Sequence, residues 1–155
     1  MLYFHGNAED IHISQHQMYM ISNYLNVSVL GMEYPGYGLY KENGSACEAK
    51  IKEDAEYIYH YCLQHIPNLK EEDIMIFGRS MGSGPACWLA GTFKPGALMI
   101  MSGYASIRRV AGDLVGWLKF IVKEQFDNVH QIARVTCPTF ILHGEQDEII
   151  AFHHA

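Results

Sequence analysis

Short apolar runs alternate along this chain with longer segments in which apolar residues recur every three or four positions. The short runs predict five β-strands, at residues 2–4, 27–32, 73–77, 97–101 and 139–142. Turn-forming residues follow each run. Strands that alternate with helix-length segments are typical of a parallel sheet with helices on both faces, and we predict this α/β class of fold.

The longer segments predict helices between the strands. One carries an apolar stripe that ends at Leu25, and the next has an apolar face that runs from Cys47 to Cys62. A third helix is expected to end near Ala90. The segment 106–124 also has a helical pattern, but two glycines interrupt it, so we expect an irregular helix there.

Composition narrows the class of protein. A chain of 155 residues suits one domain, so we expect a single, partial α/β domain over residues 1–155. The net charge of -6 argues against nucleic acid, whose phosphates require clustered Lys and Arg. The four cysteines form no C-x-x-C pair and no Cys/His cluster has the spacing of zinc ligands, so we expect reduced thiols and no metal. Neither a signal peptide nor an apolar run of membrane-spanning length is visible.

A Gly-x-Ser-x-Gly motif, formed by Gly78, Ser80 and Gly82, stands between the third predicted strand and a helix. This is the context of a nucleophile elbow, in which a serine projects from a sharp strand-to-helix turn. Glycines are needed on either side because a Cβ there would clash with the neighbouring backbone. The alternative is a glycine-rich turn that only opens a helix. The strand and helix around the motif favour Ser80 as a nucleophile.

The turn His5-Gly6-Asn7-Ala8 likewise follows a strand and precedes a helix. A backbone N–H group from such a turn can join that of Met81 to form an oxyanion hole. Asn7 is the favoured donor, ahead of Ala8. The alternative is a simple helix start that Asn7 caps.

An acidic loop at residues 143–148 follows the last predicted strand. An acid at the carboxyl end of a strand can orient a catalytic imidazole and stabilise its charged form. Asp147 is the favoured acid, while Glu145 and Glu148 compete with it. The alternative is an acidic surface loop without a role in chemistry.

These motifs, taken in order, resemble those of the α/β-hydrolase superfamily. The segments HGNA, EYPGYG, GRSMGSGP and HGEQDE each follow a predicted strand, and the similarity covers nearly the whole chain. The nearest branch is the abhydrolase group that contains protein depalmitoylases. The resemblance implies that Ser80 is the nucleophile and Asp147 the triad acid, with Asn7 and Met81 as oxyanion donors.

The same resemblance implies that Tyr34 lies beside the substrate pocket. It also implies that the turn of His5 and Gly6 borders this pocket. His5 is expected to hold its own turn rather than to act as a base. Members of this superfamily carry their histidine base some tens of residues beyond the acid. Here the chain ends eight positions after Asp147 (155 − 147 = 8), with only His153 and His154 beyond it. Their segment resembles the start of the next helix, so we expect the catalytic histidine to be absent from this sequence.

The resemblance also implies strands on both sides of those present here, so the two edges of the sheet are expected to be open to a partner or a second copy. We therefore predict a serine hydrolase of esters or thioesters that forms an acyl-enzyme and needs no cofactor. Family likeness suggests long-chain acyl groups on protein cysteines as substrates. It also suggests a cytoplasmic location with peripheral attachment to membranes. The alternative is a binding or assembly module, which the missing histidine favours and the intact elbow opposes.

Overall fold

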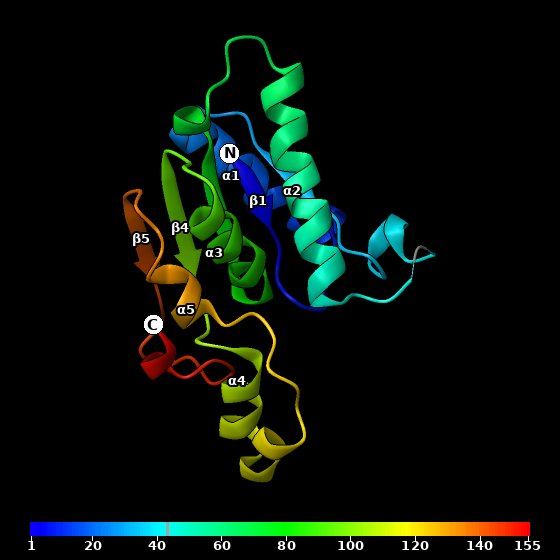
Figure 1. Cartoon of the computed structure of the whole chain (residues 1–155), viewed down its shortest axis with the longest axis vertical. Helices are drawn as coiled ribbons and strands as arrows, with labels where there is room; N and C mark the ends of the chain where they lie inside the picture. The colour runs from blue at the N-terminus through cyan, green and yellow to red at the C-terminus, as the bar shows by residue number, and fades with distance from the viewer. Residues whose placement is uncertain (43) are drawn as a thin grey trace.

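The computed structural model describes residues 1–42 and 44–155, and a five-stranded parallel sheet lies at its centre (Figure 1). The strands are β1 (Leu2–Phe4), β2 (Leu30–Met32), β3 (Met75–Arg79), β4 (Ala97–Met101) and β5 (Thr139–Leu142). They lie in the order β2-β1-β3-β4-β5, and every neighbouring pair is parallel. The predicted α/β class with a central parallel sheet is confirmed.

Two strands differ from their predicted bounds because their partners set their length. β2 begins only at Leu30, whose N–H group donates to the Met1 carbonyl oxygen at 2.9 Å. It pairs with β1, which offers three residues, so residues 27–29 have no ladder to join. β3 begins later and ends later than predicted, since all five of its residues pair with β4.

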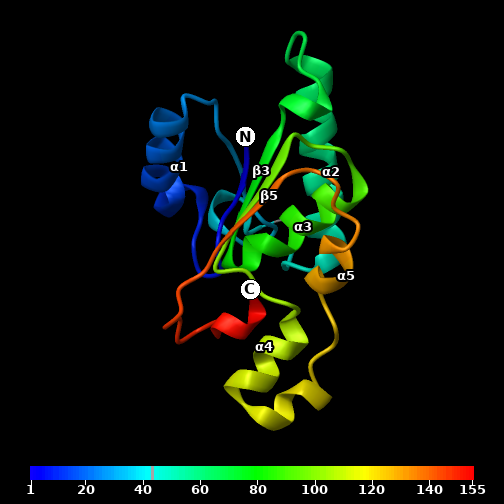
Figure 2. The same cartoon turned by 90° about the vertical axis from the view of Figure 1, so that its left-hand side faces the viewer.

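Helices cover the two faces of the sheet unequally (Figure 2). One face carries α1 (Ile11–Leu25). The other face carries α2 (Glu48–His65), α3 (Ser83–Thr92) and α5 (Asn128–Ile132). The prediction of helices on both faces is therefore confirmed, although α1 leaves part of its face open near β5.

Helix α2 begins one residue later than its apolar pattern suggests. Cys47 is its N-cap residue and is exposed, so the buried face starts at Ile51 and continues through Ala55 and Tyr59 to Cys62. The cysteine therefore lies outside the buried face of the helix, although its position continues the apolar period. The polar residues that follow it point away from the sheet because only every third or fourth position of the helix faces α3 and the core.

The main core lies between the sheet and the layer of α2 and α3. Its largest buried side chains include Tyr34, Tyr59, Phe4, Leu89 and Leu98, each at most 1% exposed. β1 is buried along its whole length, in keeping with its place inside the sheet. This packing fixes the carboxyl ends of β1 and β3, where the predicted catalytic turns begin.

Short helical elements complete the described chain. They are η1 (Gly38–Tyr40), η2 (Glu71–Asp73), η3 (Ser80–Gly82), α4 (Ile107–Leu114), η4 (Gly116–Phe120) and η5 (Phe152–His154). α4 and η4 project beyond the carboxyl edge of the sheet as a separate lobe (Figure 1), and the predicted irregularity of this segment is confirmed by the break at Val115. Among the described residues, no helix has both the length and the apolar character needed to cross a membrane.

Candidate active site

Ser80 lies on the tight turn between β3 and α3, at the carboxyl edge of the sheet. Its φ angle is 50°, a left-handed value that a non-glycine residue keeps only when its surroundings impose it. The neighbouring glycines show why. A Cβ atom on Gly78 would lie 2.5 Å from the carbonyl oxygen of Gly82, and one on Gly82 would lie 2.8 Å from that of His5. The half-buried serine is thus held by close backbone packing, as a nucleophile elbow requires.

The first turn of the chain packs directly against this elbow. A Cβ atom on Gly6 would lie 3.6 Å from the Cβ atom of Ser80. Glu9, at the end of the turn, forms an ion pair with Arg79, the residue before the serine. The structure therefore brings the two predicted halves of the oxyanion hole together and fastens one to the other.

Tyr37 links the two residues that were predicted to donate to an oxyanion. Its hydroxyl group donates to Asn7 Oδ1 at 2.6 Å and lies 3.8 Å from Met81 Sδ. Met81 is the second residue of η3, where a helical N–H group has no acceptor within the helix. The hydroxyl group of Tyr104 donates to the Met81 carbonyl oxygen at 3.2 Å and so fixes that peptide further. The donor roles of Asn7 and Met81 stay predictions, which this arrangement supports.

His5 and Tyr34 lie in the core below the first turn, and each is 0% exposed. His5 Nε2 is 2.9 Å from Glu33 Oε1, and Nδ1 is 2.9 Å from the carbonyl oxygen of Gly6. The Tyr34 hydroxyl group donates to the His5 carbonyl oxygen at 2.9 Å, and burial raises the pKa of Tyr34 well above its ordinary value. Both ring nitrogens of His5 are engaged, so this residue holds the turn and is not available to take a proton from Ser80.

The acidic loop after β5 is built around Asp147. Its Oδ1 atom accepts the N–H groups of Ile149 and Ile150, each at 2.9 Å. The hydrogen bond from Ile150 contributes most and that from Ile149 adds to it, so the pKa of Asp147 falls below its ordinary value although burial opposes the shift. Glu145 and Glu148 are exposed, and within residues 1–42 and 44–155 neither accepts a hydrogen bond. Because only Asp147 is fixed in place as a carboxylate, this geometry favours it over its neighbours as the acid.

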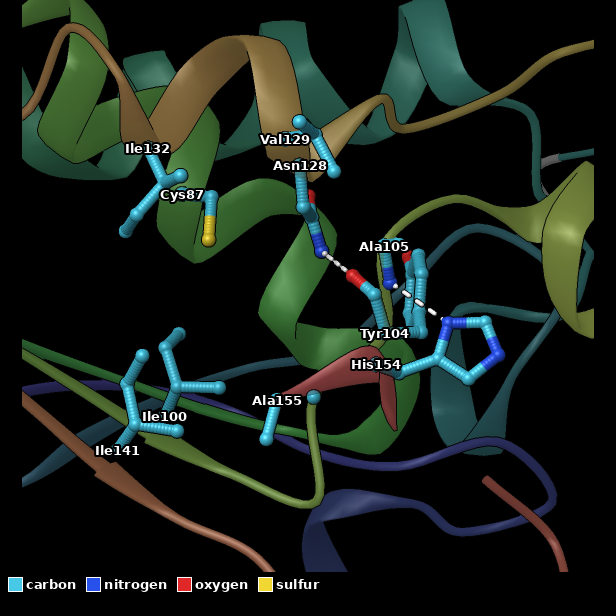
Figure 3. Close-up of a pocket in the computed structure, with 11 residues that line it drawn as sticks. Cys87, Ile100, Tyr104, Ala105, Asn128, Val129, Ile132, Ile141, His154 and Ala155 are labelled. Atoms are coloured by element: carbon cyan, nitrogen blue, oxygen red, sulfur yellow. Dashed lines mark hydrogen bonds between the residues drawn. The ribbon is translucent and has the colours of Figure 1, made fainter. Parts of the chain in front are cut away.

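The two last histidines are engaged with another carboxylate. His154 is buried; its Nδ1 atom accepts the Ala105 N–H group at 3.2 Å, and its Nε2 atom lies 2.7 Å from Asp113 Oδ2 (Figure 3 shows the contact with Ala105). His153 Nε2 lies 2.8 Å from the same oxygen. Burial would raise the pKa of Asp113, but the hydrogen bonds with His154 and His153 outweigh burial and hold this pKa below its ordinary value. Across the described chain, no histidine is hydrogen-bonded to the Ser80 hydroxyl group.

Asp113, His153 and His154 are also the one group in the described residues whose atoms are close enough to share a metal ion. The hydrogen bonds of His154 argue against such a site. Since its Nδ1 atom accepts from Ala105, the neutral ring carries its proton on Nε2, where a metal would have to bind. The cluster is therefore best described as a carboxylate that accepts from two imidazoles.

A cavity of about 200 Å³ lies between α3, α5 and the last two strands, and Cys87, Ile100, Ile132 and Ile141 form part of its apolar wall (Figure 3). Burial raises the pKa of the Cys87 thiol to about 12, so it is not an activated nucleophile. On the same wall, Asn128 donates to the carbonyl oxygen of Tyr104 at 2.9 Å. Asn128 thus holds the loop after β4 in place beside the cavity. None of the predicted catalytic residues lines this cavity.

Comparison with known proteins identifies the fold. Human alpha/beta hydrolase domain-containing protein 17B is 29% identical over 154 residues, a match that covers 99% of this chain and 52% of that protein. The Caenorhabditis elegans alpha/beta hydrolase domain-containing protein aho-3 is 30% identical over 156 residues, with 99% of this chain and 45% of that protein covered. The solved structure of Est1E from Butyrivibrio proteoclasticus with ferulic acid bound superimposes with a TM-score of 0.71 at 19% identity. That superposition covers 98% of this chain and 71% of the other.

The chain has the α/β-hydrolase fold. No family model matches it. It spans about half the length of the curated relatives it matches. The match nevertheless runs through the whole described sheet and the turns that follow its strands.

Within this α/β-hydrolase fold, three supporting residues were not foreseen from the sequence. Tyr37 lies in the segment EYPGYG and Arg79 precedes the predicted nucleophile, but the sequence pattern assigned neither residue a role. Glu33 begins the same segment, and its contact with His5 joins residues that are 28 positions apart. A signal was available only for Tyr37, since an aromatic residue between two glycines of an exposed turn needs a packing partner.

Proposed function

We propose that this chain carries the nucleophile of a serine hydrolase that cleaves carboxylic esters or thioesters. The observation that supports it best is the left-handed Ser80 on its glycine-flanked turn, next to the Asn7 and Met81 peptides. A glycine-rich turn with no chemical role would not need a strained serine at its apex, because glycine would adopt the same φ without cost. A solved esterase domain from a Rhodothermus marinus protein shares this fold, which is consistent with the proposal.

The proposed reaction begins when Ser80 Oγ attacks the acyl carbon of the substrate. The serine proton passes to a general base, and the carbonyl oxygen becomes an oxyanion that the N–H groups of Asn7 and Met81 stabilise. The bond to the alcohol or thiol then breaks, and the leaving group takes up the proton. The resulting Ser80 acyl ester is hydrolysed when water attacks the same carbon, which frees the serine and a carboxylic acid.

Asp147 is proposed to orient the base, which in this reaction type is a histidine. No residue of the described chain is assigned to that base, because His5 is held by Glu33 and His154 by Asp113. The 155-residue chain alone is therefore expected to turn over slowly. An elbow with an oxyanion hole but without an intact triad retains roughly 10³–10⁴-fold acceleration over water.

The substrate class proposed is long-chain acyl groups on protein cysteines. This rests on the resemblance of the motifs to the abhydrolase branch that contains protein depalmitoylases, and on the likeness to alpha/beta hydrolase domain-containing proteins. Fold alone does not determine substrate, so this part of the proposal stands on family likeness.

A spectrophotometric assay with p-nitrophenyl esters tests the reaction type. The 155-residue chain is expected to release p-nitrophenol only slightly faster than Ser80→Ala. The longest product of the same gene should turn over rapidly and lose that activity in Ser80→Ala. If the short chain alone turned over at enzyme-like rates that Ser80→Ala abolished, a base would be present within it and the assignment above would be wrong.

A binding or assembly module is the second candidate. It is favoured by the uncovered edge strand β5, where Phe140, Ile141 and Leu142 are 57%, 47% and 48% exposed. Exposed apolar edge strands pair readily with other chains. A stable one-to-one partner on β5, together with no esterase activity in any product of the gene, would establish this function instead.

A further inference from the structure

The lobe formed by residues 107–124 exposes a group of apolar side chains at its tip. Leu114, Val115, Trp117 and Ile121 are 59%, 43%, 61% and 69% exposed. The base of the lobe is firmly packed, since Ile107 and Val110 contact the hydrophobic core. The exposed residues are therefore presented by an anchored element, not by a loose end.

Hydrogen bonds close the lobe on itself. Arg108 Nε donates to the Val122 carbonyl oxygen at 3.0 Å, and the N–H group of Ile107 donates to the Gln125 carbonyl oxygen at 3.2 Å. Arg108 Nε also lies 4.0 Å from Glu124 Oε2. These contacts tie the start of α4 to the segment that returns to the sheet, so the tip between them is a defined surface.

The charge of this lobe is opposite to that of the rest of the chain. Residues 107–124 contain four Lys or Arg and two Asp or Glu, a net charge of +2 (4 − 2 = 2). The whole chain carries -6, so the remainder carries -8 (-6 − 2 = -8). Arg108, Arg109 and Lys123 are exposed, the two arginines at the start of α4 and Lys123 two positions after Ile121, so the lobe carries exposed positive charge as well as apolar side chains.

The lobe also lies at the functional edge of the molecule. α4 follows the carboxyl end of β4, and β4 is paired with β3, whose carboxyl end leads into Ser80 (Figures 1 and 2). A partner bound to the tip of the lobe would therefore face the edge of the sheet at which Ser80 lies.

We propose that the lobe of residues 107–124 docks this protein onto an anionic lipid bilayer. An exposed tryptophan and aliphatic side chains next to basic residues match the boundary between acyl chains and headgroups, where such residues anchor interfacial proteins. The positive lobe on an acidic protein complements phosphatidylserine and opposes the approach of a second identical lobe. Docking does not require Ser80 to react, so the docking proposal and the proposed reaction can fail independently of each other.

Sedimentation with vesicles tests the proposal. The full chain is mixed with vesicles of pure phosphatidylcholine or of phosphatidylcholine with about one third phosphatidylserine. Binding is expected to be stronger to the anionic vesicles and to weaken with salt, because each basic residue near the surface contributes about fivefold in partitioning. Trp117 emission should shift to the blue on binding, and subtraction of the Trp117→Phe spectrum removes the contribution of Trp88.

Variants then locate the surface. Trp117→Glu should reduce vesicle binding at least about tenfold through lost apolar contact and added repulsion, and Lys123→Gln about fivefold with a smaller salt dependence. Leu39→Glu is the matched control, since Leu39 is fully exposed outside the lobe and the same change should leave binding unaltered. Ser80→Ala should bind as the unaltered chain does.

Three results would overturn the proposal. They are no binding to anionic vesicles, equal binding to neutral and anionic vesicles, and equal loss of binding in Leu39→Glu and Trp117→Glu. Because Trp117 and Lys123 are both exposed, a far-ultraviolet spectrum that shows intact helices in either variant suffices to interpret its result.

Discussion

Substitution of Gly78 by alanine tests the close packing behind the elbow. The new Cβ atom would lie 2.5 Å from the Gly82 carbonyl oxygen and 2.7 Å from the Ala86 Cβ atom. Real contacts of this kind stay at 3.0 Å or beyond, so the turn must open by about 0.5 Å (3.0 − 2.5 = 0.5). Gly78 cannot move away, because it pairs with Phe4 of β1 on one side and with Ile100 of β4 on the other.

The expected cost follows from this geometry. Overpacking of a rigid site costs about 1–3 kcal/mol, and the backbone preference of alanine over glycine in a strand returns about 0.5–1 kcal/mol. The middle of these ranges leaves a net loss of about 1 kcal/mol, which lowers the melting temperature of a domain of this size by roughly 2–4 °C. Gly116→Ala is the control, since no atom lies within 4 Å of its added Cβ atom and it should be neutral or slightly stabilising.

Thermal unfolding followed by circular dichroism at 222 nm measures both variants under the same conditions. If Gly78→Ala melted at or above the temperature of the unaltered protein, the turn would have room for a side chain. The steric account of the Gly78-Ser80-Gly82 motif would then be refuted. If Gly116→Ala lowered the melting temperature as much as Gly78→Ala, the effect could not be attributed to close packing at the elbow.

Three further changes test the surroundings of the site. Tyr37→Phe removes the hydrogen bond to Asn7 and should slow covalent labelling of the serine about tenfold without change in melting temperature, less than the 10²–10³-fold effect of losing an oxyanion donor itself. Asp147→Ala leaves two N–H groups without their acceptor and should cost about 1–3 kcal/mol of unfolding free energy in urea. The pKa of Asp147 is depressed in the folded state, so this difference should be full near neutral pH and vanish as pH falls through that pKa, below 3.8. At pH 8 iodoacetamide should modify exposed Cys47 in the native protein, and buried Cys87 only after unfolding.

Each of these expectations has a control. Tyr40→Phe, in the same turn region, should leave the labelling rate unchanged. Equal slowing in both variants would show that the Tyr37 hydrogen bond to Asn7 has no specific part in the reaction. Glu148→Ala should not alter stability, because Glu148 is exposed. A pH-independent cost of Asp147→Ala would show that its carboxylate charge has no part in holding the loop. Rapid alkylation of Cys87 in the native protein would show that the cavity beside it opens.

The sheet and the turns at the carboxyl ends of β1 and β3 could be predicted from the sequence because both depend on local patterns. Apolar runs of strand length occur at 2–4, 97–101 and 139–142, and the structure has strands with those bounds. Gly78 and Gly82 could be recognised from spacing alone, since the elbow needs glycines at fixed offsets from its serine.

The supports of the site escaped prediction because they depend on contacts between distant segments. Glu9 meets Arg79 across 70 positions, and Tyr37 meets Met81 across 44. No local pattern encodes either contact, since the pairing of β1 with β3 is what brings these residues together. The start of α2 was also misplaced, because an apolar residue at 47 continues the helical period although its backbone is extended.

The partners of the last histidines could not be foreseen for the same reason. Their position after the acid allows a catalytic interpretation, which the likeness of their segment to the start of the next helix opposes. The structure places both beside Asp113, about 40 positions earlier in the chain, and hydrogen-bonds neither of them to Ser80.

The identity of the nucleophile is the central claim, and labelling by a fluorophosphonate probe with peptide mapping tests it most directly. The probe is applied to this chain and to the longest product of the same gene, each with its Ser80→Ala counterpart. The account predicts one adduct, on Ser80, formed rapidly in a longer product that supplies a further histidine after residue 155 and slowly or not at all in the 155-residue chain. An adduct on another residue, or none on Ser80 in any product, would contradict it.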